Sequence, residues 1–177
     1  MQSLYYPAVL GAALVFVLNK FSTYSSVIEA GKDITNYFGV FVLIYCSVIY
    51  LEIYLIRPKS YGMLAFISDF IEIIFLFLAF SALGFLEPTA HDKVNLQRFY
   101  LYASVAVISD QFWMIFVNKA EGLLLWFVCL GCTAVMIFGY LIGARYVWYN
   151  ISILILFVVV FTWYFFHVRR DLFHTSR

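Results

Sequence analysis

Long apolar segments, separated by short polar turns, dominate this sequence. Most of them run for roughly 17 to 25 residues, which is long enough to cross about 30 Å of hydrocarbon at about 1.5 Å per helical residue. A large soluble core would instead be built from shorter amphipathic stretches. The segments therefore predict an all-α integral membrane protein, a bundle of about six transmembrane helices joined by short loops.

The overall composition points the same way. Apolar residues make up 65% of the chain and charged residues only 12%, whereas soluble domains are about half apolar and a quarter charged. A soluble fold of this size would have too few polar residues to cover its surface. The formal net charge is +1 and no basic arm is present, so we expect a lipid bilayer and no nucleic acid as partner.

The expected spans form a single transmembrane domain over residues 1–177. They cover residues 4–19, 37–56, 61–86, 98–118, 123–143 and 148–167. The first is the shortest, and if it does not cross, five spans remain. Between the first two lies a polar stretch in which Tyr24, Val27 and Ile28 fall on one side of a helical turn. This stretch predicts a short helix on the membrane surface.

Orientation is predicted from the lysines and arginines near the span ends. With both termini inside, six of these residues are cytoplasmic and five lie outside. The cytoplasmic set is Arg57, Lys59, Lys119, Arg169, Arg170 and Arg177, and the outer set is Lys20, Lys32, Lys93, Arg98 and Arg145. The basic tail and the turn around Pro58 add to this small difference. We therefore predict a multi-pass protein with both termini in the cytoplasm.

The most informative residues are four carboxylates inside expected spans: Glu52, Asp69, Glu72 and Asp110. An ionisable group at membrane depth costs a few kcal/mol, so it must turn inward, find a partner, take up a proton or line water. Counted along the helices, the four lie roughly 8 to 16 Å from the same side. Asp69 and Glu72 are three residues apart and share a helix face. The sequence thus predicts one layer of acids.

Two interpretations of this layer are open. No lysine or arginine occupies the middle of any expected span, so either some acids hold protons or a cation lies among them. That interpretation is a proton or cation path. In the alternative, the acids form hydrogen bonds with Ser68, Ser109, tyrosines or backbone groups and fix the packing of the helices.

A second candidate site contains sulfur. Cys129, Cys132 and Met136 fall on one helix face, and soft sulfur ligands suit Cu(I). Paired thiols could also exchange with a disulfide, but membrane thiol oxidoreductases usually use a second pair and only Cys46 remains. Cysteine also packs well as a small apolar residue. No cofactor can be named from this pattern. Gly139 and Gly143 have the spacing of a close helix contact.

Three functional hypotheses follow. The first is a small channel or carrier for protons or cations, in which the acid layer lines the path and several copies of the chain enclose a pore. The second is a non-catalytic membrane subunit or sensor packed against partner proteins in a larger complex. The third is a membrane-embedded enzyme acting on thiols or lipid. No catalytic motif supports it, and we do not expect an enzyme.

Overall fold

The fold is that of a computed structural model, which describes residues 2–56, 62–86, 95–117 and 123–168. Side chains are described in these ranges except at 2–6, 49–56, 114, 117, 123–125 and 167–168. The helices are α1 (Gln2–Phe21), α2 (Val27–Ala30), α3 (Ile34–Ile56), α4 (Met63–Ala82), α5 (Leu96–Val117), α6 (Leu123–Leu141) and α7 (Val147–Trp163). A short 3₁₀ turn, η2 (Gly143–Arg145), precedes α7, and a π-helical turn, η3 (Tyr164–Val168), follows it. The described residues contain no strand, which confirms the all-α prediction.

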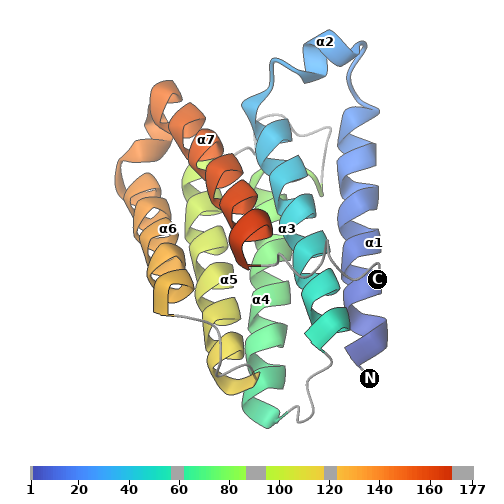
Figure 1. Cartoon of the computed structure of the whole chain (residues 1–177). Helices are drawn as coiled ribbons and strands as arrows, with labels where there is room; N and C mark the ends of the chain where they lie inside the picture. The colour runs from blue at the N-terminus through green and yellow to red at the C-terminus, as the bar shows by residue number, and fades with distance from the viewer. Residues whose placement is uncertain (1, 57–61, 87–94, 118–122, 169–177) are drawn as a thin grey trace.

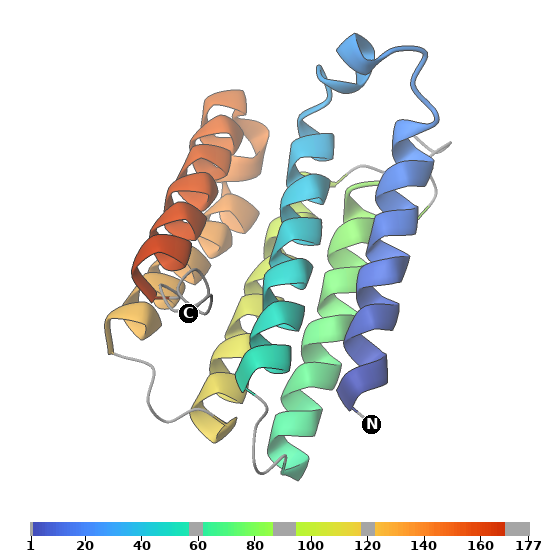
Figure 2. The ribbon, with the colours of Figure 1, turned by 45° about the vertical axis from the view of Figure 1, so that its right-hand side comes forward.

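The six long helices form an up-and-down bundle in which consecutive helices run antiparallel (Figure 1). α4 and α5 pack against each other most extensively, and α5 also packs along α6. α1 lies against α3 and α4, whereas α7 has lighter contacts with α3 and α6 (Figure 2). The short helix α2 projects from one end of the bundle, which we call the α2 end (Figure 1).

Each long helix falls on one expected apolar segment, but several ends differ. α1 continues to Phe21 and so includes Lys20, which the sequence placed in a loop. α3 begins at Ile34, before the expected start at Tyr37. This earlier start has a local cause, because the Asp33 carboxylate accepts the Thr35 N–H at 2.9 Å and so caps the first turn.

α4 ends at Ala82, earlier than expected, because the chain turns at a glycine. Gly84 has a φ of 75°, a conformation that costs residues with a Cβ more than glycine. Its N–H donates to the Ser81 carbonyl at 3.0 Å, and the Phe85 N–H donates to the Phe80 carbonyl at 3.0 Å. The Phe80 and Phe85 rings meet with centroids 5.6 Å apart. Together these contacts form a Schellman helix end.

The structure confirms a short helix in the polar stretch after α1, although its orientation differs from the prediction. Val27 and Ile28 are 87% and 76% exposed, whereas Tyr24 turns inward. The prediction that these three side chains share one face is therefore wrong. The reason is the Tyr24 hydroxyl, which donates a 2.6 Å hydrogen bond to the Asp33 carboxylate and draws the ring toward the bundle.

Two tyrosines and an asparagine join α5, α6 and α7 near the α2 end. Tyr100 donates to the Asn150 side chain at 2.7 Å, and the Tyr149 hydroxyl donates to the carbonyl of Val135. The Tyr100 ring lies over Gly139 and the Tyr149 ring lies over Gly143, and in each case a Cβ on the glycine would collide with the ring. Gly139 therefore marks a close contact between α6 and α5, as predicted, whereas Gly143 lies beyond α6 in η2 and marks a close contact with α7.

The outer surface of the bundle is largely apolar. Side chains of α4 and α7 that are more than half exposed include Met63, Leu64, Phe70, Val147, Trp148, Ile155, Val158 and Val159. Lys20, Asp69 and Glu72 are in contrast buried. By length and composition alone, two of the described helical segments qualify as membrane spans, namely Met63–Ala82 and Val147–Phe166. The bundle thus turns apolar side chains outward and encloses several of its polar groups.

Candidate functional site

At the α2 end, a buried lysine joins three helices. Lys20 of α1 is 3% exposed. Its Nζ donates to Thr35 Oγ1 of α3 at 2.6 Å and to the Leu83 carbonyl beyond α4 at 2.8 Å. The same atom lies 3.6 Å from Asp33 Oδ2 and 4.5 Å from the centroid of the Phe85 ring. The carbonyl groups at a helix C-terminus carry partial negative charge and favour a cation, so the end of α4 offers the ammonium an acceptor.

Asp33 completes this group, which we call the Lys20 cluster (Lys20, Tyr24, Asp33 and Thr35). One carboxylate oxygen accepts the Tyr24 hydroxyl at 2.6 Å, and the other accepts the Thr35 N–H and hydroxyl at 2.9 and 2.7 Å. Burial acts to raise the pKa of Asp33, but the hydrogen bonds from Tyr24 and Thr35 and the charge of Lys20 hold it below its usual value. Burial and the Asp33 hydrogen bond raise the pKa of Tyr24 to about 12.

The predicted acids lie in the other half of the bundle, within a larger set of inward polar groups. Three come from α4 and three from α5, and we call them the polar layer: Ser68, Asp69, Glu72, Ser109, Asp110 and Gln111. Asp69 and Glu72 are 5% and 1% exposed, and Asp110 is half-buried. Because α4 and α5 pack antiparallel, Asp69 and Asp110 both lie on the order of 10 Å from the same end of the bundle. Glu52 falls in the last turns of α3, but its side chain lies outside the described residues.

Tyr45 of α3 adds a hydroxyl to the polar layer. It lies within electrostatic range of both Asp110 of α5 and Glu72 of α4. Among the described residues, its buried hydroxyl has no hydrogen-bond partner, and neither has either amide atom of buried Gln111. Buried polar atoms are nearly always paired, with protein or with water. The Tyr45 hydroxyl and the Gln111 amide could therefore form hydrogen bonds with water or with a ligand.

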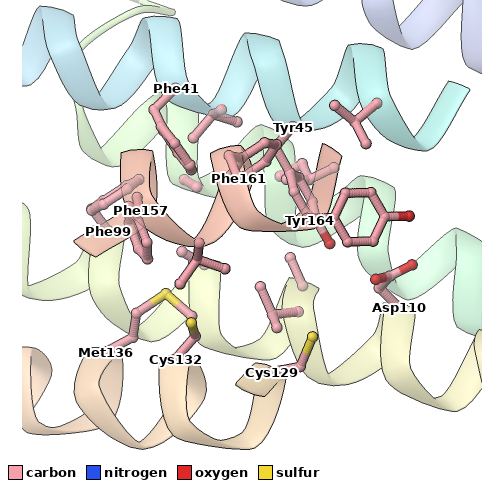
Figure 3. A pocket seen from close by; sticks show the side chains of 18 residues that line it. Phe41, Tyr45, Phe99, Asp110, Cys129, Cys132, Met136, Phe157, Phe161 and Tyr164 are labelled. Atoms are coloured by element: carbon pink, nitrogen blue, oxygen red, sulfur yellow. The ribbon is translucent and has the colours of Figure 1, made fainter. Parts of the chain in front are cut away.

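An apolar cavity of about 140 Å³ adjoins the polar layer. Its walls come from α3, α4, α5, α6 and the end of α7, and among its lining residues Asp110 supplies the single carboxylate. Figure 3 shows Asp110 and Tyr164 at one end of this cavity and Phe99 and Met136 toward the other. The carboxylate thus stands at the boundary between a polar and an apolar region.

The predicted sulfur residues also meet at this cavity. Cys129, Cys132 and Met136 all line it from α6 (Figure 3), which fits their expected common face. None of the cysteines forms a disulfide within the described part of the chain. In the same ranges, no group of three His, Cys, Asp or Glu side chains is placed to hold a metal ion. The Cu(I) site stays a prediction from the sequence.

Three participants were not found by sequence reasoning. Lys20 stands just after an apolar segment, so the sequence predicts a loop residue. Asp33 and Thr35 are typical of a helix start, and their oxygens could have indicated partners for the ammonium. Gln111 has no distinguishing pattern around it. Tyr45 carries a weak signal, because tyrosines of membrane helices gather near the ends and this one lies mid-helix.

No family model matches the chain, and no curated protein or solved structure is similar to it.

Proposed function

We propose that this chain is a multi-pass membrane protein that carries protons or small cations through the polar layer. The apolar exterior of the bundle supports the membrane part of this proposal. Soluble monomers rarely expose apolar patches larger than a few hundred Å², whereas long side chains on the outer faces of α1, α4, α6 and α7 are exposed here. Helices with apolar outer faces need lipid, or another protein, against them.

One observation supports the transport part of the proposal. Six buried or half-buried polar side chains, three of them carboxylic acids, come from the two packed helices α4 and α5. Ionisable groups inside membrane helices are costly, and in membrane proteins they mark ion pathways and proton relays. The hydroxyl of Tyr45 and the amide of Gln111 add donors and acceptors that the described residues leave unused. A proton or a hydrated cation would satisfy them.

The Lys20 cluster argues against a purely structural role for the polar layer. There, each charged group meets donors or acceptors at 2.6–2.9 Å. Where this chain uses polar groups to hold helices together, it matches them closely. In the polar layer, the side-chain amide of Gln111 has no hydrogen-bond partner among the described residues, and neither has the adjoining Tyr45 hydroxyl. These two groups favour the transport interpretation over helix packing.

The cavity favours a carrier over an oligomeric pore. It is lined by helices of one chain and Asp110 is among its lining residues, so a binding site does not need a second copy. Association into a homo-oligomer or a larger membrane complex stays a prediction, as does the cytoplasmic position of both termini.

The test uses the full chain reconstituted in liposomes, with a pH-sensitive dye and an imposed cation gradient. We expect flux in the wild type and a loss on the order of tenfold or more in Asp69→Asn and in Asp110→Asn, because removing a relay group costs at least a factor of ten. Glu29→Gln, which changes an exposed acid of α2, is the matched control and should retain wild-type flux.

Unchanged flux in both variants, together with an altered melting temperature, would show that the acids serve packing. The subunit hypothesis is tested on the same samples by native mass spectrometry. A chain that is stable only with another protein would contradict the carrier.

A further inference from the structure

The cavity beside the polar layer is larger and more apolar than a proton path requires. Its volume of about 140 Å³ is close to that of an engineered protein cavity of roughly 150 Å³ that binds benzene. A water-filled proton path needs polar walls, and these walls are largely apolar. The cavity is therefore suited to an organic body of about one ring.

Aromatic side chains form the wall between α3 and α7. Phe41 stacks on Phe157 with centroids 4.7 Å apart, and Phe161 meets Phe41 edge-on at 4.7 Å. Tyr45 contacts Phe161 at 6.4 Å. Such rings favour an aromatic guest in stacked or edge-on contact, and their faces attract a cation.

Two polar groups stand at one end of this wall. Asp110 lines the cavity, and the Tyr45 hydroxyl, which also belongs to the lining, lacks a hydrogen-bond partner among the described residues. Figure 3 shows both side chains near Tyr164, away from the Phe99 end. A carboxylate accepts hydrogen bonds and repels anions, and a tyrosine hydroxyl can donate or accept. The polar end therefore selects a cationic donor.

We infer that the cavity binds a small aromatic primary amine in its protonated form. The ammonium group donates to the Asp110 carboxylate and the Tyr45 hydroxyl, and the ring lies against Phe41, Phe157 and Phe161. This assignment rests on the proposed function, since it names the class of cation that the polar layer handles.

The experiment is calorimetric titration of the full chain in lipid nanodiscs, with empty nanodiscs as the blank. The probes are phenethylamine and n-propylbenzene, which have nearly the same shape and differ in the ammonium group. A hydrogen bond to a charged group contributes about 1.5–3 kcal/mol, so we expect the amine to bind on the order of 10- to 100-fold more tightly. In Asp110→Asn this preference should disappear while propylbenzene still binds. Tyr45→Phe should reduce it by a smaller factor.

A cavity-filling variant tests the location of the ring. Ala103 lines the cavity, and Ala103→Phe should abolish binding of both probes. Ile115→Phe, at a 44% exposed position on the same helix, is the matched control and should bind both. If Ala103→Phe fails to fold, Cys132→Phe fills the same space from α6.

Equal affinity for the two probes, an amine preference that survives in Asp110→Asn, or no binding by the wild type would each overturn the inference. Binding and flux are measured separately, so the two proposals can fail separately. Amine binding that depends on Asp110 without any flux would leave the inference standing and refute the carrier. Flux without amine binding would leave the carrier standing and refute the inference about the amine.

Discussion

The two halves of this bundle differ in how fully some of their buried polar groups are hydrogen-bonded. At the α2 end, the Lys20 ammonium forms hydrogen bonds with a hydroxyl and a carbonyl and an ion pair with a carboxylate. It also lies over the face of an aromatic ring. In the other half, the amide of Gln111 in the polar layer and the nearby hydroxyl of Tyr45 have no hydrogen-bond partner among the described residues. The described lysines and arginines lie at helix ends or in turns: Lys20 in the last turn of α1, Lys32 between α2 and α3, Arg98 in the first turn of α5 and Arg145 in η2.

The contrast separates a polar cluster whose members bond to one another from one that includes buried polar atoms without a partner among the described residues. A saturated cluster is rigid, because moving any member breaks several strong bonds. A cluster with spare donors and acceptors can accept a guest without breaking existing bonds. The four predictions below test this difference, from the largest expected effect to the smallest.

Removing the cation of the Lys20 cluster should have the largest effect on stability. Lys20→Met leaves Asp33 without its ion-pair partner and the Leu83 carbonyl without its donor. Breaking a buried pair on one side costs about 3–5 kcal/mol, although the partly exposed Asp33 places this case near the lower value. Thermal unfolding in detergent measures the change, with exposed Lys32→Met as the control. A loss below about 1 kcal/mol would mean that the cluster does not stabilise the bundle.

Adding a methyl group at Gly39, in the same part of the bundle, should have the next largest effect on stability. The Phe85 ring, which lies beneath Lys20, packs directly onto Gly39, where a Cβ would collide with it. Gly39→Ala should therefore displace the ring and cost about 1–3 kcal/mol. Gly11→Ala is the control, because a Cβ there meets open space and alanine favours a helix by roughly 0.5–1 kcal/mol. Equal melting temperatures for the two variants would contradict the close packing.

The pH dependence of stability should reveal Asp33. Its folded pKa lies below the usual value of 3.8, so its contribution is complete above that value and is lost as the pH falls through the folded pKa. The wild type should lose stability below about pH 4, and Asp33→Asn should lose less over the same range. Melting temperatures between pH 6 and pH 3 test this, and parallel curves for the two proteins would refute it.

The smallest stability change is expected at the most deeply buried acid. Glu72→Gln removes an ionisable group whose burial in charged form is costly and keeps the shape of the side chain, so stability should change by about 1 kcal/mol or less, in either direction. Proton flux should nevertheless fall. A loss comparable to that of Lys20→Met would show that the two halves are alike, and that Glu72 is a structural residue.

Much of the fold follows from the apolar segments, because their length and spacing leave few alternatives to an antiparallel bundle. The positions of the helix ends could be predicted less well from the sequence. The early end of α4 depends on Gly84, and the early start of α3 depends on the Asp33 cap, both of which act within a few residues. The buried position of Lys20 could not be predicted, because its acceptor at Leu83 is 63 residues away in sequence.

The candidate site was partly predictable for a similar reason. Asp69, Glu72 and Asp110 are conspicuous in apolar segments, and counting along antiparallel helices places them at one level. The cavity and its aromatic wall depend on how α3 and α7 pack, and nothing in the local pattern around Phe41 or Phe157 indicates their contact. Cys129, Cys132 and Met136 were correctly assigned to one face by helical spacing alone.

The separation between Lys20 and Leu83 also has a consequence during synthesis. Asp33 and Thr35 are 13 and 15 residues from Lys20, so a ribosome adding about 5–20 residues per second supplies them within about three seconds. Leu83 follows Lys20 by 63 residues and, at the same rate, is made about 3 to 13 seconds after it. The ammonium can therefore form its ion pair with Asp33 before its second acceptor exists. We therefore expect the α1–α3 hairpin to gain a stable end first, and α4 to pack against it afterwards.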